Sequence, residues 1–331
     1  MPVANKPILF YGIEAIRDAG ITEVGIIVGD TAEEVKASVG DGSRLGVKVT
    51  YIPQDQPLGL AHAVKISRDF MNDDPFVMYL GDNLLSGGIT GFVREFKKGQ
   101  YDAQILLTRV KNPSEFGVAE LDGDRVVGLE EKPKKPKSDY ALVGVYMFTP
   151  RIFEATDKIK PSWRGELEIT DAIQYLIEND FVVNSHIVDG WWKDTGKLED
   201  MLDANRMILM GMAQPDRVQS RQLEDSEIHG DVHLADDVTI RGSILRGPCI
   251  IGAGSKIINS YVGPFTSIGR GSHVESSEVE NSIILENCRI IDIGSRLSDS
   301  LMGRNVSVRR GNQLPRSYRL MVGDNSEITV L

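Results

Sequence analysis

Aliphatic residues recur about every six positions through the last third of the chain, and this period constrains the fold more than any other feature. A six-residue register with breaks is typical of a parallel β-helix, in which each face of a triangular coil turns one aliphatic side chain inward. An irregular β-sandwich is the alternative. The recurring positions are Ile228, Leu234, Ile240, Ile244, Ile250, Val262, Ile268, Val274, Ile284, Ile290, Met302 and Val308.

The first two thirds of the chain carry a different pattern, in which helix and strand signals alternate. Strands separated by helices predict βαβ units and a parallel sheet. A hairpin turn is predicted at Leu121-Asp-Gly-Asp124. We predict domains over 1–212 and 226–331, joined by a linker at 213–225. The predicted helices are 7–20, 59–70, 168–179 and 198–212, and the predicted strands are 23–29, 47–51, 76–80, 104–110, 142–148 and 182–188.

Composition excludes several classes of protein. The formal charge of −11 argues against nucleic acids and anionic membranes as main partners, since both favour basic proteins. The start of the chain has no signal-peptide pattern, and no apolar run is long enough to span a bilayer, so we expect a soluble cytoplasmic protein. The two cysteines, Cys249 and Cys288, are expected to be core thiols. The five histidines show no metal-ligand spacing and are interpreted as structural or surface residues: His62, His186, His229, His233 and His273.

A run of buried-type residues, Phe76 to Leu80, stops abruptly at Gly81 and Asp82. This pattern predicts a central parallel strand that delivers a carboxylate to its C-terminal edge, where open α/β sheets bind ligands. A carboxylate there suits a hard cation such as Mg²⁺, which in turn suits phosphates. A second acid, Asp194, precedes a turn in Trp191-Trp-Lys-Asp-Thr-Gly196.

Four further segments are suggestive only in combination. Gln54-Asp-Gln-Pro-Leu-Gly-Leu-Ala61 enters a helix with an amide and a glycine near its start, and Phe116-Gly-Val118 offers a glycine where a ligand could approach the backbone. Glu130-Glu-Lys-Pro133 and Arg164-Gly-Glu-Leu-Glu-Ile-Thr-Asp171 combine acids with a cation. Taken singly, these segments are equally compatible with ordinary turns, a solvated charge run and a helix start.

In this order the motifs resemble those of the sugar-1-phosphate nucleotidylyltransferases, and in particular the long-type glucose-1-phosphate thymidylyltransferases. The resemblance covers nearly the whole chain. It implies a Rossmann-like (GT-A-like) α/β nucleotidyltransferase domain with a mixed, mainly parallel sheet, followed by a left-handed parallel β-helix. It also implies Mg²⁺-dependent transfer of a nucleotidyl group from dTTP or UTP to glucose 1-phosphate, which gives dTDP-glucose (or UDP-glucose) and pyrophosphate.

The resemblance further implies a role for each matching residue. Asp82 and Asp194 would hold the Mg²⁺, and Lys132 and Arg164 would act with them in catalysis by holding the sugar phosphate. The implied nucleotide-binding residues are Gln54, Pro57, Gly59, Leu60 and Gly81, with Gln54 reading the pyrimidine edge. The implied sugar-phosphate-binding residues are Gly117, Glu131, Lys132, Val143, Tyr146 and Arg164.

One family motif, the phosphate loop Gly-Gly-x-Gly-Thr-Arg-Leu-x-Pro, does not occur in this sequence. Such a loop wraps a triphosphate with backbone N–H groups. We expect that the recorded start lies downstream of the real one, and that this polypeptide as written has little or no transferase activity. Lys6 belongs to a later segment of the family pattern and does not replace the missing cations.

Other functions stay open at this point. The chain could be a non-catalytic protein that binds a sugar phosphate or a sugar nucleotide, or a uridylyltransferase. An acyltransferase in the β-helix is a third possibility, with His229, His233 and His273 as candidates. We expect the β-helix instead to assemble the protein into a homo-oligomer, because its coil ends and flat faces commonly associate.

Overall fold

The computed structural model describes residues 1–331 except 124, 213–222, 312–319, 323–325 and 330–331. The chain forms two compact units: unit 1 contains residues 1–2 and 6–204, and unit 2 contains residues 3–5 and 205–331. The division falls inside helix α8 (Leu198–Gly211), ahead of the predicted linker. Most of that linker lies outside the described residues, and its end already forms strand β13 (Leu223–Glu224). The boundaries 1–212 and 226–331 therefore stay predictions.

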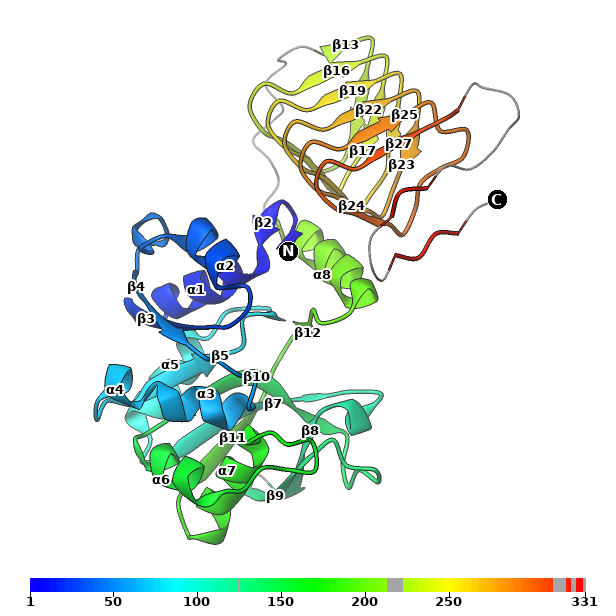
Figure 1. The fold of residues 1–331 in the computed structure, drawn as a ribbon. Coiled ribbons are helices and arrows are strands. Elements are labelled where there is room, and N and C mark those ends of the chain that lie inside the picture. The colour runs from blue at the N-terminus through cyan, green and yellow to red at the C-terminus, as the bar shows by residue number, and fades with distance from the viewer. Residues whose placement is uncertain (124, 213–222, 312–319, 323–325, 330–331) are drawn as a thin grey trace. The chain divides into compact units, whose positions relative to one another are not determined.

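Unit 1 alternates helices and strands, as predicted (Figure 1). Its helices are α1 (Ile8–Asp18), α2 (Ala32–Val39), α3 (Leu60–Ile66), α4 (Arg68–Met71), α5 (Thr90–Lys98), α6 (Arg151–Lys158) and α7 (Ile169–Glu178), and it holds the start of α8. Its strands are β3 (Glu23–Val28), β4 (Lys48–Pro53), β5 (Phe76–Tyr79), β6 (Asn83–Leu85), β7 (Ala103–Arg109), β8 (Gly117–Asp122), β9 (Arg125–Glu131), β10 (Tyr140–Phe148), β11 (Val183–Ile187) and β12 (Trp192–Asp194). Strands β1 (Pro2–Val3) and β2 (Lys6–Pro7) stand at the start of the chain.

The helix predicted over 59–70 is two helices. Helix α3 ends at Ile66, and α4 starts at Arg68. Ser67, between them, donates its hydroxyl to the Val64 carbonyl at 2.7 Å. A serine hydroxyl that bonds a preceding helix carbonyl competes with the backbone for that acceptor, which favours a helix break.

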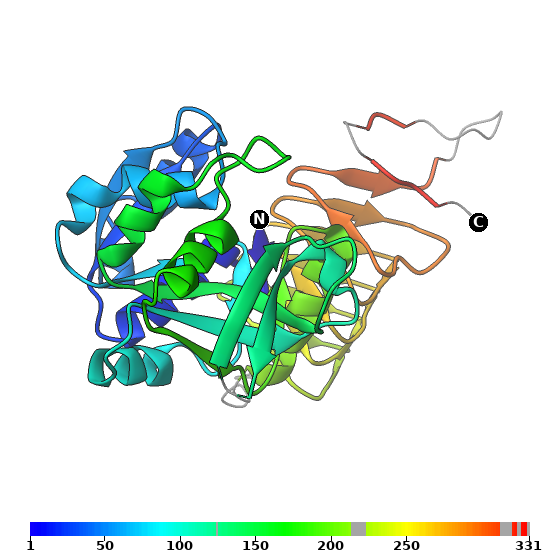
Figure 2. The ribbon, with the colours of Figure 1, turned by 90° about the horizontal axis from the view of Figure 1, so that it is seen from below.

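The sheet of unit 1 is mixed, but its strand pairings are mostly antiparallel, which differs from the mainly parallel sheet expected. Strand β10 pairs antiparallel with β5, β7 and β8, and β8 pairs antiparallel with β9 in the predicted hairpin (Figure 2). Parallel pairs join β7 to β11 and β3 to β4. Strand β5, which leads to Asp82, is therefore not in a parallel ladder. A hairpin reverses the chain within a few residues, so it gives antiparallel neighbours where a helical crossover would give parallel ones.

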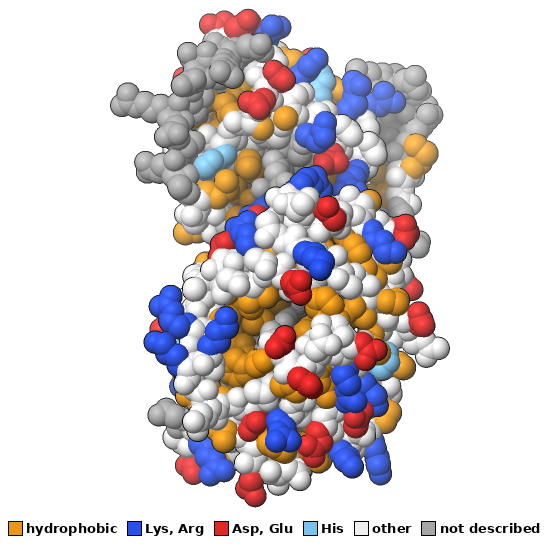
Figure 3. Space-filling view, turned by 90° about the vertical axis from the view of Figure 1, so that its left-hand side faces the viewer, with side chains coloured by type: hydrophobic (Ala, Val, Ile, Leu, Met, Phe, Trp, Pro, Cys, Tyr) orange, Lys and Arg blue, Asp and Glu red, His pale blue; other side chains and the backbone are white. Residues whose placement is uncertain are grey.

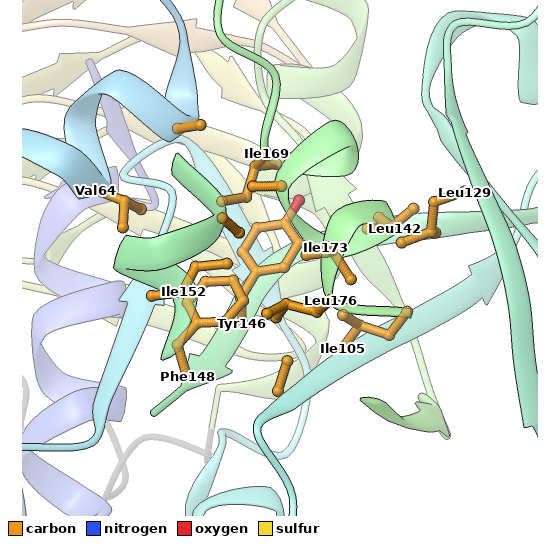
Figure 4. Close-up of a cluster of buried hydrophobic side chains, with 14 of the residues drawn as sticks. Val64, Ile105, Leu129, Leu142, Tyr146, Phe148, Ile152, Ile169, Ile173 and Leu176 are labelled. Atoms are coloured by element: carbon orange, nitrogen blue, oxygen red, sulfur yellow. The ribbon is translucent and has the colours of Figure 1, made fainter. Parts of the chain in front are cut away.

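Strand β10 separates two hydrophobic clusters because its side chains alternate between the faces of the sheet. Leu142, Tyr146 and Phe148 pack against residues of α3, α6 and α7 (Figure 4). Val143 and Val145 pack on the opposite side, against residues of α5 such as Val93. Helices thus cover both faces of the sheet and fix β10 at its centre.

Unit 2 is a parallel β-helix, which confirms the fold predicted from the six-residue period. Its strands form three ladders of parallel pairs, one ladder per face (Figure 1). The first ladder is β13, β16 (Thr239–Arg241), β19 (Lys256–Ile258), β22 (His273–Glu275), β25 (Arg289–Ile291) and β27 (Ser307–Arg309). The second is β14 (Glu227–His229), β17 (Ile244–Arg246), β20 (Tyr261–Val262) and β23 (Glu278–Val279), and the third is β15 (Val232–Leu234), β18 (Cys249–Ile251), β21 (Thr266–Ile268), β24 (Ile283–Ile284) and β26 (Leu301–Met302).

Two of the inward positions predicted from the period are wrong. Leu245 and Ile251 are completely buried, whereas Ile244 is 39% exposed and Ile250 is partly exposed. The reason is the length of the coil: Ile240 pairs with Ile257, and Ile257 pairs with Val274, so one turn takes 17 residues at these positions and not 18. One face of each such coil is therefore one residue shorter than a strict six-residue repeat requires.

Within the described residues, no helix is long and apolar enough to cross a membrane. On the face drawn in Figure 3, lysine and arginine side chains lie among aspartate and glutamate and do not gather in one patch. This mixture agrees with the acidic net charge of the whole sequence.

Candidate active site

A two-stranded ribbon in unit 1 brings Asp82 and Asp194 next to each other. Strands β6 and β12 pair antiparallel, with Asp194 opposite Asn83, the residue that follows Asp82. Thr195 ties the two ends together, because its backbone N–H and its hydroxyl donate to the Asp82 carbonyl at 3.0 and 2.6 Å. Two carboxylates from segments more than a hundred residues apart thus meet at one end of the ribbon.

The environment of Asp194 disfavours its charged form. Burial raises the pKa of this carboxyl, and the negative charge of Asp82 raises it further. Its Oδ1 accepts a hydrogen bond from the Gly196 N–H at 3.0 Å, and Asp82 Oδ1 accepts one from Asn83 Nδ2 at 2.8 Å. Across the described part of the chain, neither carboxylate forms an ion pair with a lysine or arginine. Adjacent carboxylates with no neutralising ion pair, of which Asp82 is exposed and Asp194 is partly buried, are suited to a divalent cation.

Asn83 holds this end of the site rigid, and the sequence motifs had not singled it out. Its side chain is almost completely buried. The Oδ1 atom accepts from the indole Nε1 of Trp192 at 2.6 Å and from the Gly144 N–H at 3.1 Å, while Nδ2 donates to Asp82. Every polar group of this amide is therefore used to join β6, β10 and β12.

Beside the ribbon lies a cavity of about 230 Å³. Most of the residues predicted to bind a sugar phosphate line it, together with one aspartate of the ribbon and the first residue of α3. The predicted site residues that line the cavity are Leu60, Gly117, Glu131, Lys132, Tyr146, Arg164 and Asp194. The cavity therefore joins acids, cations and an aromatic hydroxyl in one concave site, which is the usual form of a small-molecule site.

Arg164 is surrounded by carboxylates at the wall of the cavity. Its guanidinium lies 2.9 Å from Glu166, 3.4 Å from Glu168 and 3.7 Å from Glu131. Burial raises the pKa of Glu131, and the charge of Glu168 adds to that rise. Tyr146 is buried next to this cluster, and burial together with the charge of Glu131 raises the pKa of its hydroxyl.

Lys132 and Gly117 line the same cavity, and their positions are fixed by the backbone and by close packing. Lys132 has a φ of +42°, a strained conformation for a residue with a side chain, and its N–H donates to the Phe116 carbonyl at 3.0 Å. A Cβ on Gly117 would lie 2.6 Å from the Thr170 methyl group, so close packing alone requires a glycine there.

Val143 is the predicted sugar-pocket residue whose side chain does not face the cavity. Its neighbours Leu142 and Gly144 line the cavity, while Val143 is buried in the cluster on the opposite face of the sheet. The alternation of side chains along β10 explains this difference.

The predicted nucleotide-binding loop lies between β4 and α3. The Leu58 carbonyl accepts from the Leu167 N–H at 2.7 Å, and the Ala61 N–H donates to the Leu167 carbonyl at 3.0 Å. Gly59 has a φ of +102°, and a Cβ there would lie 2.4 Å from the Leu167 carbonyl oxygen. This glycine thus lets the loop join the segment that carries Arg164. Gln54, Pro57, Gly59, Gly81 and Asp82 are not among the residues that line the cavity.

Residues 1–211 match the protein family described as "Nucleotidyl transferase". The chain belongs to this family. This match spans the ribbon, the cavity and the nucleotide-binding loop, and so covers every predicted site residue.

Full-length relatives of this nucleotidyl transferase share both parts of the chain. A glucose-1-phosphate thymidylyltransferase of Streptomyces griseus is 54% identical over 331 residues, which is 100% of this chain and 92% of that protein. Another from Streptomyces antibioticus is 53% identical over 99% of this chain and 92% of that protein. Among solved structures, one from Bacillus anthracis, assigned as a glucose-1-phosphate thymidylyltransferase and crystallised with sucrose, superposes with a TM-score of 0.60. It is 34% identical and covers 65% of this chain and 87% of that one.

The candidate site contains three residues that the motifs did not single out: Asn83, Trp192 and Thr195. Each stands directly beside a predicted residue or inside a quoted motif, so the signal was present in the sequence. Their side chains bond the backbone or one another. Such contacts depend on strand pairing, which a sequence motif does not reveal.

Proposed function

We propose that this chain is a glucose-1-phosphate thymidylyltransferase. The observation that carries the proposal is the ribbon of Asp82 and Asp194 beside a cavity lined by Lys132, Arg164 and Glu131. The 54% identity to the Streptomyces griseus enzyme over the whole chain supports dTTP and glucose 1-phosphate as its substrates.

In the proposed reaction, a phosphate oxygen of glucose 1-phosphate attacks the α-phosphorus of dTTP. A new oxygen–phosphorus bond forms as the bond from the α-phosphorus to the bridging oxygen breaks, and pyrophosphate leaves with that electron pair. Lys132 and Arg164 hold the sugar phosphate, one as a point charge and one as a planar fork. Glu131 and the Gly117 backbone bind sugar hydroxyls. Gln54, Pro57, Gly59, Leu60 and Gly81 bind the nucleotide.

Asp82 and Asp194 would hold Mg²⁺, which neutralises charge on the two anions that must meet. The two carboxylates fit this role because they are adjacent, Asp194 is partly buried, and neither forms an ion pair within the described residues. The protein supplies only these two acids, since the described residues contain no cluster of three or more histidine, cysteine or acidic groups. Phosphate oxygens and water would complete the coordination of the cation.

Product binding is the first test, because dTDP-glucose would contact both the nucleotide-binding residues and the sugar-phosphate-binding residues of the proposed site. Isothermal titration of dTDP-glucose with Mg²⁺ should give a saturable signal that weakens when Mg²⁺ is chelated. In the Asp82→Asn variant, Mg²⁺ should no longer strengthen dTDP-glucose binding, while the affinity for glucose 1-phosphate should stay unchanged. Absence of dTDP-glucose binding would contradict the proposal.

A non-catalytic sugar-nucleotide-binding protein is the second candidate, because the cavity lined by Glu131, Lys132 and Arg164 would bind a sugar phosphate with or without turnover. A pyrophosphate-release assay with dTTP, UTP and glucose 1-phosphate separates the two. Turnover of about one per second or faster is an ordinary enzyme rate and would exclude the binding protein. Product binding without any pyrophosphate release would favour it.

We also propose that the β-helix of unit 2 assembles the protein into a homo-oligomer. The support is a stretch of apolar side chains near the end of the described chain, at Leu320, Met321 and Val322, all more than half exposed. Exposed apolar clusters commonly mark association surfaces.

A further inference from the structure

Gln54 leaves β4 and starts the nucleotide-binding loop with both of its amide hydrogens occupied. Its Nε2 lies 3.0 Å from His62 Nδ1 and 3.4 Å from the Gly59 carbonyl oxygen. The backbone of Gln54 is fixed as well, because its N–H donates to the Val28 carbonyl at 2.8 Å. His62 is a residue of α3, so the helix itself positions the partner of the amide.

The two partners decide which way the amide points. A carbonyl oxygen only accepts hydrogen bonds, so the Gln54 atom that faces Gly59 is the NH₂ group. The same NH₂ group donates to His62 Nδ1, which must then be the unprotonated ring nitrogen, with the proton on Nε2. The Gln54 Oε1 atom is left over, and in the described part of the chain no donor is bonded to it.

A free Oε1 is an acceptor, and acceptors discriminate among pyrimidine bases. Thymine and uracil carry a hydrogen on ring atom N3, whereas cytosine N3 is itself an acceptor. An amide fixed with Oε1 outward bonds the first two bases and leaves a lone-pair repulsion against the third. Sites that use fixed hydrogen bonds in this way reject the wrong partner more strongly than sites that rely on shape.

We infer that His62 is a positioning residue that holds the Gln54 amide with its oxygen outward and thereby sets the preference for a base with an N3–H group. The inference rests on the proposed function, in which Gln54 reads the base. It would give His62, which the sequence marks only as a structural or surface residue, a specific role at the site. Without His62 Nδ1, only the longer contact to the Gly59 carbonyl orients the amide, so it can more readily rotate and present NH₂ to the ligand, which suits cytosine.

Two substitutions of His62 separate this role from simple packing. His62→Ala removes the acceptor, whereas His62→Asn places an amide oxygen where Nδ1 stood. The measurement is the dissociation constants of dTDP and dCDP with Mg²⁺, by calorimetry on the full chain. Loss of one orienting hydrogen bond should weaken dTDP binding about fivefold, with dCDP unchanged or tighter. His62→Asn should restore most of the preference for dTDP.

The controls are His186→Ala and Gln54→Ala. His186 is another partly exposed histidine of unit 1, beside Glu95 and Phe92, and its removal should leave both constants unchanged. Gln54→Ala should abolish the remaining preference. Glucose 1-phosphate affinity should be equal in all variants, which shows that they are folded.

The possible failures differ in what they overturn. If the native chain prefers dTDP and His62→Ala keeps that preference, or His62→Asn behaves like His62→Ala, the role of His62 is wrong and the proposed function stands. If the native chain binds neither nucleotide, or binds dCDP as well as dTDP, the proposed function fails and the inference fails with it.

Discussion

Asp194 is a carboxyl group whose surroundings oppose its charge, since burial and the neighbouring Asp82 both raise its pKa. The native pKa lies above that of the unfolded chain, so the native state keeps this proton to a higher pH. The stability that comes from this tighter proton binding is present at low pH and is lost as the pH rises through the native pKa. At neutral pH without a cation, the charged pair therefore destabilises the fold.

We expect Asp194→Asn to raise the melting temperature at neutral pH in the absence of Mg²⁺. A gain of about 2–4 °C corresponds to about 1 kcal/mol in a domain of this size. Differential scanning calorimetry from pH 4 to pH 8 should show that this gain in melting temperature grows with pH. Added Mg²⁺ should stabilise the native chain but not Asp194→Asn, so that the native chain then melts at the higher temperature. A gain that is independent of both pH and Mg²⁺ would contradict the charge argument.

Arg164 is the cation that lies among Glu131, Glu166 and Glu168 and offsets part of their charge, so its removal should cost stability as well as ligand affinity. Glu168 is 4% exposed and would lose its nearby guanidinium. We expect Arg164→Ala to lower the unfolding free energy by about 2 kcal/mol, less than the cost of breaking a fully buried pair because Arg164 is partly exposed. Urea unfolding measures this cost.

The matched variant is Arg164→Lys, which keeps the positive charge but lacks the planar guanidinium that can bond two oxygens at once. It should recover most of the stability but little of the affinity for glucose 1-phosphate, because a single ammonium cannot bond a phosphate in two places. Equal stability of the native protein and Arg164→Ala would show that the three glutamates do not need this cation.

The strands of unit 2 show which part of an element the sequence can predict. Inward positions such as Ile268, Val274 and Ile290 follow from the period alone, and each is completely buried. The position of the short face does not, because Ile244 and Leu245 are both aliphatic and either could turn inward. Only the pairing of Leu245 with Ile228 and Val262 in neighbouring coils selects one of them.

A ladder of buried serines fixes this 17-residue register between coils. The Ser260 N–H donates to Ser243 Oγ at 3.0 Å, and the Ser277 N–H donates to Ser260 Oγ at 3.2 Å. Each hydroxyl in turn donates within its own coil, as Ser260 Oγ does to the Ile258 carbonyl at 2.7 Å. One serine per coil therefore satisfies two backbone groups where the chain turns.

Ser260→Ala should leave the Ser277 N–H without this partner in a buried corner, while the Ile258 carbonyl keeps the hydrogen bond from the Ser276 N–H. The expected cost is about 1–3 kcal/mol, the usual penalty for a buried unpaired polar group. Chemical unfolding followed by circular dichroism measures it. Ser298→Ala is the control, since Ser298 is exposed and the same measurement should give a change below about 0.5 kcal/mol.

For the whole molecule, the sequence predicts two folds but not how the chain is shared between the two units. Residues 3–5 belong to unit 2, where the Ala4 N–H donates to Asn205 Oδ1 at 2.9 Å and Asn5 Nδ2 donates to the Ile268 carbonyl at 2.8 Å. Partners 201 and 263 residues apart in the sequence leave no local period or motif. The candidate site was more predictable, because its motifs stand together, whereas Asn83 and His62 make contacts that form only in the folded chain.

The final prediction concerns self-association. Leu320, Met321 and Val322 form a described stretch in which Met321 is completely exposed, and so much apolar surface is seldom left to water in a monomer. The triple substitution of these residues by serine should reduce the hydrodynamic size in gel filtration with light scattering and leave dTDP-glucose binding intact.

Serine at Val127 and Val182, two exposed valines of unit 1, should change neither property. An unchanged particle mass after the triple substitution would mean that these side chains do not hold copies together. Loss of dTDP-glucose binding in the triple variant would instead show that assembly supports the active site.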